Sequence, residues 1–135
     1  MELKPVNPTV KTPAANFTGD VYLTPIYSGS EPSRMTVGLV RFTPGARTNW
    51  HSHAVGQTLH VTEGVGLVVN REDQVIRMRA GDTVWTLPGE EHWHGGTNTT
   101  CMSHLAMLEG PEAGGDGTTW LEPVTDEQYE AAHQG

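Results

Sequence analysis

Short stretches in which apolar and polar residues alternate recur along most of this chain. Such alternation is typical of a β-strand, because successive side chains of a strand point to opposite faces. The clearest stretch runs from Arg34 to Thr43. Further strands are predicted over residues 21–24, 49–53, 57–62, 66–70, 74–79, 83–87 and 100–108.

Turn-forming residues separate these predicted strands. The turn signals are Pro44-Gly45, Glu63-Gly64, Ala80-Gly81 and Pro88-Gly89. About nine short strands with such regular turns predict an all-β sandwich or small barrel, and jelly-roll closure is favoured because it hides strand edges. Residues 1–18 are expected to form an irregular N-terminal arm. Near the other end, Thr125 and Gln128 fit a capping box, which predicts a short helix over 125–132.

Length and composition agree with one globular domain. The 135 residues include 16 glycines and 9 prolines, and 18% of them are charged. We therefore expect a single domain over 1–135 with a barrel core at about 34–108.

Charge and cysteine content exclude several classes of function. The net charge is −8 and the eight Lys and Arg residues are scattered, so nucleic-acid binding is excluded. No apolar run approaches the ~18 residues of a membrane span, and the first residues lack the apolar core of a signal peptide. Cys101 is the only cysteine, so no disulfide forms within one chain. A cytoplasmic location is expected.

Histidine is the residue type that carries candidate chemistry. Four of the seven histidines form two clusters, His51-Ser52-His53 and His92-Trp93-His94. Residues two apart on a strand share a face, so each cluster can direct two imidazoles to one point, and Gln57 has the same parity as His51 and His53. Three neutral imidazoles and an amide oxygen suit a divalent first-row metal with open positions. The alternative is a set of surface histidines near loops.

Two spaced motifs around these clusters resemble the cupin family. The first is Gly45-(five residues)-His51-Ser52-His53-(three)-Gln57-(six)-Gly64. The second is Gly81-(five)-Leu87-Pro88-Gly89-(two)-His92-(three)-Gly96. The resemblance implies a cupin double-stranded β-helix, which is a jelly-roll barrel. Leu87 and Gly96 depart from the usual Pro and Asn at turn positions, and Gln57 stands where many cupins have Glu.

Gln57 changes the chemistry expected of a metal site. A ligand set of three His and one Glu cancels one charge of a divalent ion, whereas three His and one Gln leave both charges. The ion is then a harder Lewis acid and less able to stabilise the trivalent state that oxygen activation usually needs. Redox-neutral chemistry is favoured.

A narrower resemblance is to the small bacterial cupins with hydroxynitrile lyase activity. It is carried by residues 45–48, 56–59, 88–95, 104–106 and 124–129. It implies that His51, His53, Gln57 and His92 bind the metal, Mn²⁺ first and Fe²⁺, Zn²⁺, Ni²⁺ or Co²⁺ as possible substitutes. It also implies His104 as the pocket base and places His94 beside the metal.

Other residues are given simpler interpretations. His94 is a fifth ligand, an orienting residue or a base, and the pattern does not separate these. His60 is predicted to face away from the metal and His133 to be solvated. Trp50 and Trp93 are expected to point away from the ligands, and Arg47 to lie on the surface. One of two strand faces is expected to line the cavity: Gly38, Val40 and Phe42, or Met102, Ala106 and Leu108.

The hypothesis is a metal-dependent lyase that cleaves or forms cyanohydrins of the mandelonitrile type. His104 takes or gives the proton, and a small molecule is the substrate. The alternatives are a metal-dependent dioxygenase, a non-catalytic binding protein, and an isomerase or decarboxylase. By resemblance, a homodimer or homotetramer is expected.

Overall fold

The alternating segments of the sequence form an all-β barrel with one short helix. The computed structural model describes residues 1–134, and within them twelve strands and one helix are present. In chain order they are β1 (Val10–Lys11), β2 (Phe17–Thr18), β3 (Val21–Ser28), β4 (Met35–Phe42), β5 (Arg47–Thr48), β6 (His51–His53), β7 (Gln57–Asn70), β8 (Val75–Arg79), β9 (Thr83–Thr86), β10 (His92–Gly96), β11 (Met102–Glu109), β12 (Thr118–Trp120) and α1 (Asp126–Ala131).

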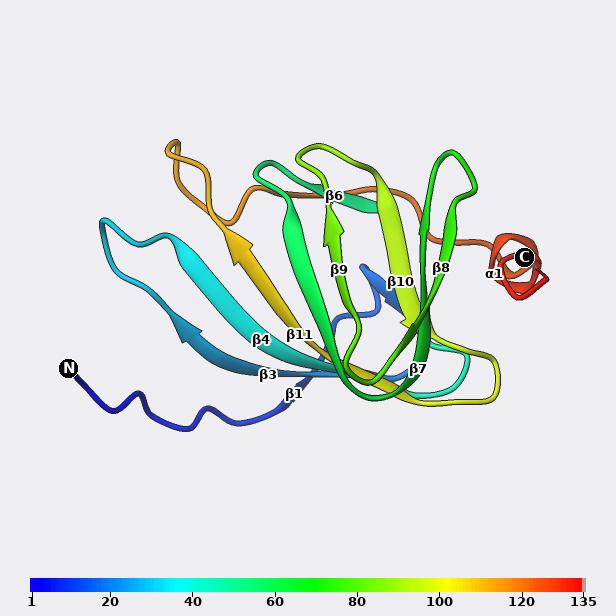
Figure 1. The fold of residues 1–135 in the computed structure, drawn as a ribbon, viewed down its shortest axis with the longest axis horizontal. Helices are drawn as coiled ribbons and strands as arrows, with labels where there is room; N and C mark the ends of the chain where they lie inside the picture. Colours follow the sequence, from blue (N-terminus) through cyan, green and yellow to red (C-terminus); the bar gives the residue numbers. More distant parts are fainter. Residues whose placement is uncertain (135) are drawn as a thin grey trace.

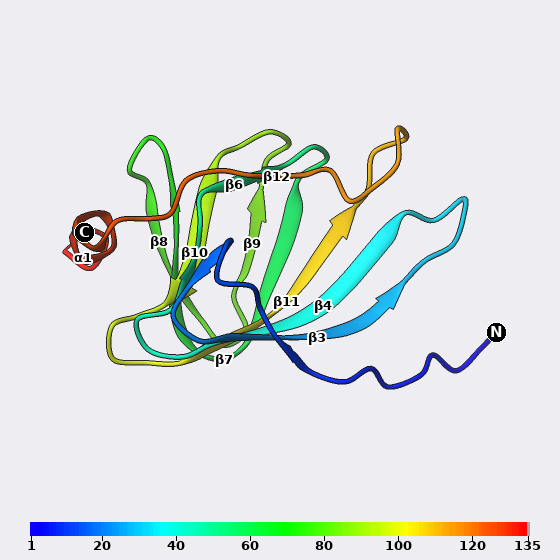
Figure 2. The same ribbon diagram turned by 180° about the vertical axis from the view of Figure 1, so that it is seen from behind.

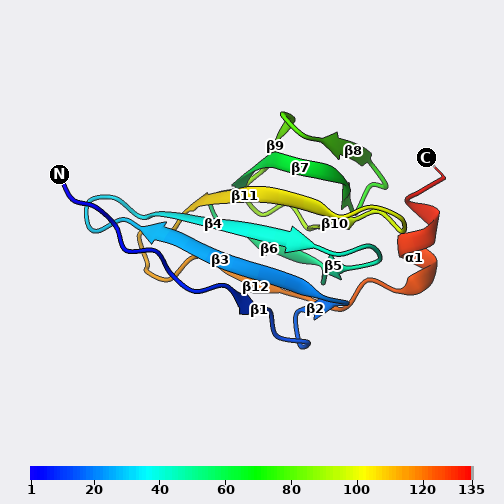
Figure 3. The ribbon, with the colours of Figure 1, turned by 90° about the horizontal axis from the view of Figure 1, so that it is seen from below.

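Two curved antiparallel sheets form the barrel and share strand β7. The first sheet runs β1-β3-β4-β11-β7, with β9 on the other side of β7. The second contains β2, β5, β10, the later part of β7, and β8, with β6 beside β10 and β12 beside β6. Strands β3, β4, β11 and β7 follow one another across one side of the molecule (Figure 3), and the sheets curl around a common interior (Figure 1).

Strand β7 is longer than the sequence predicted, because the expected turn at Glu63-Gly64 is a bend within one strand. Residues up to Gly64 pair with β11, and Gly66–Asn70 pair with β10. Gly64 has a φ of 77°, and a Cβ at this position would overlap the backbone of Cys101. A glycine is therefore required where the strand passes from one sheet to the other.

The hydrophobic core fills the space between the two sheets. Its buried residues are Val21, Val40, Phe42, Ala46, Leu59, Val61, Val68, Met78 and Met102. A second buried cluster lies where α1 packs against the second sheet, and it contains Trp50 and Trp93 as well as Tyr129 of the helix. Both tryptophans therefore point away from the clustered histidines, as their positions in the alternation predicted.

Arg47 corrects one expectation, because it is buried rather than on the surface. Only 5% of it is exposed, and its guanidinium makes an ion pair of 2.8 Å with Asp126 and donates to the carbonyl of Val124. It also lies over the ring of Tyr129, 4.5 Å from the centroid. Helix α1 and the residues just before it, which supply these partners, lie about 80 residues away in the sequence, so spacing near Arg47 gives no sign of them.

The two ends of the chain lie at opposite ends of the barrel (Figure 2).

The predicted arm over 1–18 contains two short strands that the pattern did not predict, β1 against β3 and β2 against β5. Helix α1 is where it was predicted, and Thr125 and Gln128 form the expected capping box. Across residues 1–134, no helix is both long enough and apolar enough to span a membrane.

The bend at Gly64 can be tested by substitution to alanine. Gly64→Ala introduces a side chain that overlaps Cys101 and strains a positive φ, so we expect it to lower the free energy of unfolding by about 2 kcal/mol or more. Gly81→Ala is the matched control, because Gly81 also has a positive φ but nothing lies within 4 Å of its Cβ position. Urea unfolding measures the free energy of unfolding of both variants. Equal losses in Gly64→Ala and Gly81→Ala would show that the overlap with Cys101 does not destabilise the fold.

Candidate metal centre

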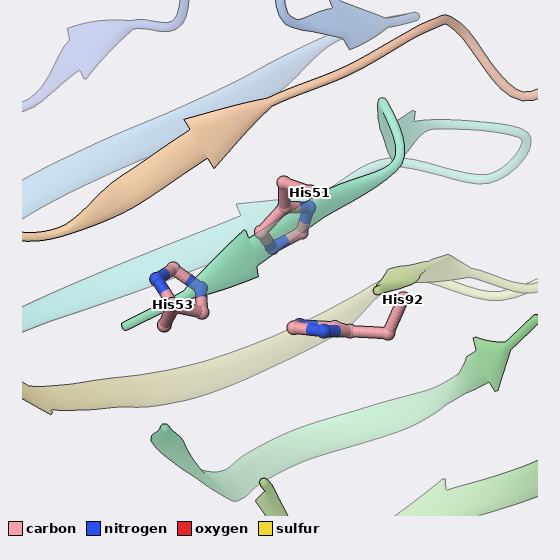
Figure 4. Close-up of side chains that lie close together, drawn as sticks. All are labelled: His51, His53 and His92. Carbon is pink, nitrogen blue, oxygen red and sulfur yellow. The ribbon is translucent and has the colours of Figure 1, made fainter. Parts of the chain in front are cut away.

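Three histidines from two neighbouring strands face one another inside the barrel. His51 and His53 share a face of β6, and His92 begins β10, directly opposite His51 in the ladder. At least one ring nitrogen from each lies within 4.8 Å of the others, and all three side chains are buried (Figure 4). Strand alternation brings the first two together, and the register of β6 with β10 adds the third.

Hydrogen bonds fix how these three rings are turned. Nδ1 of His51 donates to the carbonyl of Asn49, and Nδ1 of His92 donates to the carbonyl of Glu90. The distance from nitrogen to oxygen is 2.9 Å in each case. Since a carbonyl only accepts, the proton of each neutral ring is on Nδ1, and the lone pair is on Nε2. Nδ1 of His53 lies 3.0 Å from the hydroxyl of Thr118 on β12.

The remaining atoms of the cluster fit a divalent metal ion. Nε2 of His53, Nε2 of His92 and Oε1 of Gln57 are buried, and each lacks a hydrogen-bond partner within residues 1–134. A buried polar atom without a partner is costly, and a metal ion would satisfy nitrogen lone pairs and an amide oxygen together. The donor set of His51, His53, His92 and Gln57 therefore fits such an ion.

His94 and His104 form a separate pair beside this cluster. Nδ1 of His94 lies 3.2 Å from Nε2 of His104, and both side chains are buried. The ring of Phe42 packs against both, with centroids 5.6 Å away in each case. Nδ1 of His104 is buried without a partner in the described chain.

One cavity of about 190 Å³ is lined by most of these groups, and His92 is not part of its lining. Histidines 51, 53, 94 and 104 line it together with Gln57, and the rest of the wall is mostly apolar. Both predicted strand faces contribute, rather than one, because β4 and β11 are adjacent and Gly38 lies opposite Ala106. The lining residues are Phe17, Leu23, Thr36, Gly38, Val40, Thr48, His51, His53, Gln57, His94, His104, Ala106, Leu108, Asp116, Thr118 and Trp120.

Burial keeps the histidines of this region neutral. Desolvation, followed by repulsion from neighbouring imidazoles, lowers the pKa of His51 and His94 well below the ordinary value near 6.5. Burial lowers the pKa of His53 and of His104 to about 4. At neutral pH the rings therefore offer lone pairs rather than positive charge.

Sequence reasoning missed β12 (Thr118–Trp120) and the nearby Asp116. Strand β12 pairs with β6, brings Thr118 to His53 and places the ring centroid of Trp120 4.8 Å from that of His51. Four glycines between 110 and 117 precede it, so the local pattern indicates a loop rather than a wall of the site. Phe17, in the predicted arm, was also missed.

The other predicted positions are as follows. His60 faces away from the cluster, as expected, and bonds the hydroxyl of Thr83. His133 is half-buried rather than solvated, because its ring accepts from the backbone of Asn98 and donates to the carbonyl of Tyr129.

The fold and the spacing of these residues define a class of protein. The chain belongs to the cupin family, whose cupin domain matches residues 38–107. It is 45% identical over 131 residues to an (R)-mandelonitrile lyase from Granulicella tundricola, and the match covers 96% of this chain and 98% of that protein.

Solved structures show the same architecture. A cupin-like protein from Thermotoga maritima is 32% identical, with a TM-score of 0.84 over 98% of this chain and 97% of that chain. A cupin 2 conserved barrel domain protein from Rhodopseudomonas palustris is 16% identical, with a TM-score of 0.69 over 95% of this chain and 84% of that chain. At that identity the second likeness concerns the fold alone.

Thr118→Val tests whether the hydroxyl from β12 orients His53. The substitution keeps the shape but removes the hydrogen-bond partner of Nδ1, so we expect manganese affinity to fall by about 10- to 100-fold. Thr119→Val on the same strand is the matched control, because Thr119 is exposed. Competition with a chromophoric chelator measures both affinities, and equal affinities in the two variants would contradict the assignment.

The pKa of His104 predicts acid sensitivity of the metal-free protein. Because the folded-state pKa is about 4 and the unfolded value is near 6.5, the unfolded chain binds more protons between these values. The contribution of neutral His104 to the free energy of unfolding is therefore complete above pH 6.5 and is lost as the pH falls towards 4. When the pH is lowered from 7 to 5, the free energy of unfolding should fall by about 2 kcal/mol less in His104→Leu than in the wild type, as measured by urea unfolding. An identical pH dependence in both proteins would refute this.

Proposed function

We propose that this cupin is a metal-dependent lyase that cleaves or forms cyanohydrins of the mandelonitrile type. The observation that carries the proposal is a single cavity, in which three members of the donor set (His51, His53 and Gln57), the buried base candidate His104 and an apolar wall meet. The 45% identity to an (R)-mandelonitrile lyase over nearly the whole chain supports the same reaction.

His51, His53, His92 and Gln57 are proposed to hold the ion, with manganese as the first choice. When bound there, a divalent ion supplies positive charge that stabilises a developing alkoxide or cyanide. Gln57 is neutral, so this ligand set leaves both charges of the ion uncompensated. Such a site favours polar chemistry over oxygen activation, which supports the lyase rather than the dioxygenase alternative.

His104 is proposed to move the proton. If Nε2–H of His104 donates to Nδ1 of His94, the lone pair of its Nδ1 is free to accept the hydroxyl proton of the cyanohydrin. As that proton leaves, the C–O bond becomes a carbonyl, and the C–CN bond breaks with its electron pair on cyanide. The proton held at His104 then passes to cyanide, which gives hydrogen cyanide and restores the base.

The cavity wall favours an uncharged substrate. None of its described lining residues is Lys or Arg, and Asp116 is the only carboxylate among them. The lining side chains themselves would therefore not pair with a charged substrate, and their mostly apolar surface suits the uncharged body of a cyanohydrin.

Release of benzaldehyde from mandelonitrile tests the proposal. The manganese-loaded protein should release benzaldehyde, which absorbance follows, and His51→Ala should abolish the release by removing a ligand. His104→Ala should lower kcat by about 100-fold or more while the bound manganese stays at the wild-type level.

Two results would count against this account. Wild-type protein that holds manganese but releases no benzaldehyde would reject the lyase, and oxygen uptake measured in parallel would point to the dioxygenase. If His104→Ala lost its manganese, His104 would be needed to hold the ion, and its assignment as a base alone would be rejected.

A further inference from the structure

Two aromatic rings from distant parts of the sequence meet at the opening of the cavity. Phe17 on β2 and Trp120 on β12 have ring centroids 5.4 Å apart, and their planes are tilted by 57°. Both line the cavity. Because Trp120 lines the cavity and still exposes 38% of its surface, it lies at the boundary between the cavity and solvent.

The barrel holds both rings close to the candidate metal centre. Phe17 is opposite Thr48 of β5, and Trp120 is opposite His51 of β6. The ring of Trp120 lies 4.8 Å from the ring of His51, with 36° between the planes. Any group that enters the cavity beside this pair is therefore close to the donor set.

Saturated side chains form another part of the same cavity wall. Leu23 of β3 is directly opposite Val40 of β4, and both line the cavity. The wall thus offers aromatic surface from one pair of strands and aliphatic surface from another. Aromatic rings attract a further aromatic ring beyond the area that it buries, through edge-to-face or offset contacts.

We propose that Phe17 and Trp120 form an aromatic rim that determines substrate specificity by binding the aryl group of the substrate. This inference rests on the proposed function, because it names the residues that recognise the substituent of the cyanohydrin. It requires that the rim prefer a flat aromatic ring to a saturated ring of the same carbon count. If Trp120 only covered His51, its removal would change manganese binding and leave that preference as it was.

The test compares two alcohols that differ only in the ring. Benzyl alcohol and cyclohexylmethanol are titrated calorimetrically into the manganese-loaded wild-type protein and into variants. We expect the wild type to bind benzyl alcohol about three- to tenfold more tightly than cyclohexylmethanol. The ratio should fall to about one in Trp120→Leu and stay near the wild-type value in Trp120→Phe.

Two more variants complete the test. Trp85→Leu is the matched control, because Trp85 is 58% exposed and does not line this cavity, and it should leave the ratio unchanged. Phe17→Leu should lower the ratio as Trp120→Leu does. If Trp120→Leu loses manganese, the Phe17→Leu variant still tests the rim. Within residues 1–134, the aromatic contact of Phe17 is to Trp120 and not to a histidine.

An unchanged ratio in both leucine variants, no ring preference in the wild type, or no measurable binding of benzyl alcohol would each overturn the aromatic rim. These titrations involve no cyanide chemistry. A protein that fails to cleave mandelonitrile can therefore still show the ring preference, and the two proposals fail separately.

Discussion

The orientation of buried imidazoles depends on hydrogen bonds from Nδ1 to fixed acceptors. His51 and His92 each donate to the carbonyl of the residue two positions earlier, Asn49 and Glu90. Each sequence motif thus contains, just before a short strand, the carbonyl that orients the first histidine of that strand. The two Nε2 lone pairs are turned inward before any ion arrives, so less reorganisation accompanies binding.

The rest of the barrel keeps these short strands in place. Strand β6 has three residues and lies between β10 and β12, while β10 lies between β7 and the short strands β5 and β6. Arg47 of β5 is opposite Gly95 of β10 and is tied to helix α1 through Asp126. The helix therefore stabilises the edge of the sheet that carries His92, although it is far from the cavity. Burial of five neutral histidines also couples ion binding to the stability of the fold.

Much of the barrel could be predicted from the sequence, because its information is local. Alternation located part of every long strand and the capping box located the helix, although β3 continues to Ser28 and β7 passes through the predicted turn at Glu63-Gly64. The convergence of His51, His53 and His92 follows from parity together with the register of two strands. Parity also predicted correctly that Trp50, Trp93 and His60 point away from the cavity.

The remainder depends on contacts between distant segments. Thr118 and Trp120 reach the site only because β12 pairs with β6, and a glycine-rich stretch conceals that pairing in the sequence. The burial of Arg47 and of His133 could not be predicted from local spacing, because Asp126 and Asn98, which contact them, lie 79 and 35 residues away in the sequence. The sequence predicts a turn where β7 bends, because Glu63-Gly64 has the composition of a turn whether the chain reverses or crosses between sheets.

We propose that Nε2 atoms of three histidines and the amide oxygen of Gln57 bind one metal ion. A crystal structure of the manganese-loaded protein, with an anomalous difference map at the manganese edge, is the decisive measurement. We expect one ion bonded to Nε2 of His51, His53 and His92 and to Oε1 of Gln57, with His94 unbound and next to His104. An ion held by His94, or a Gln57 amide turned away from the ion, would contradict it.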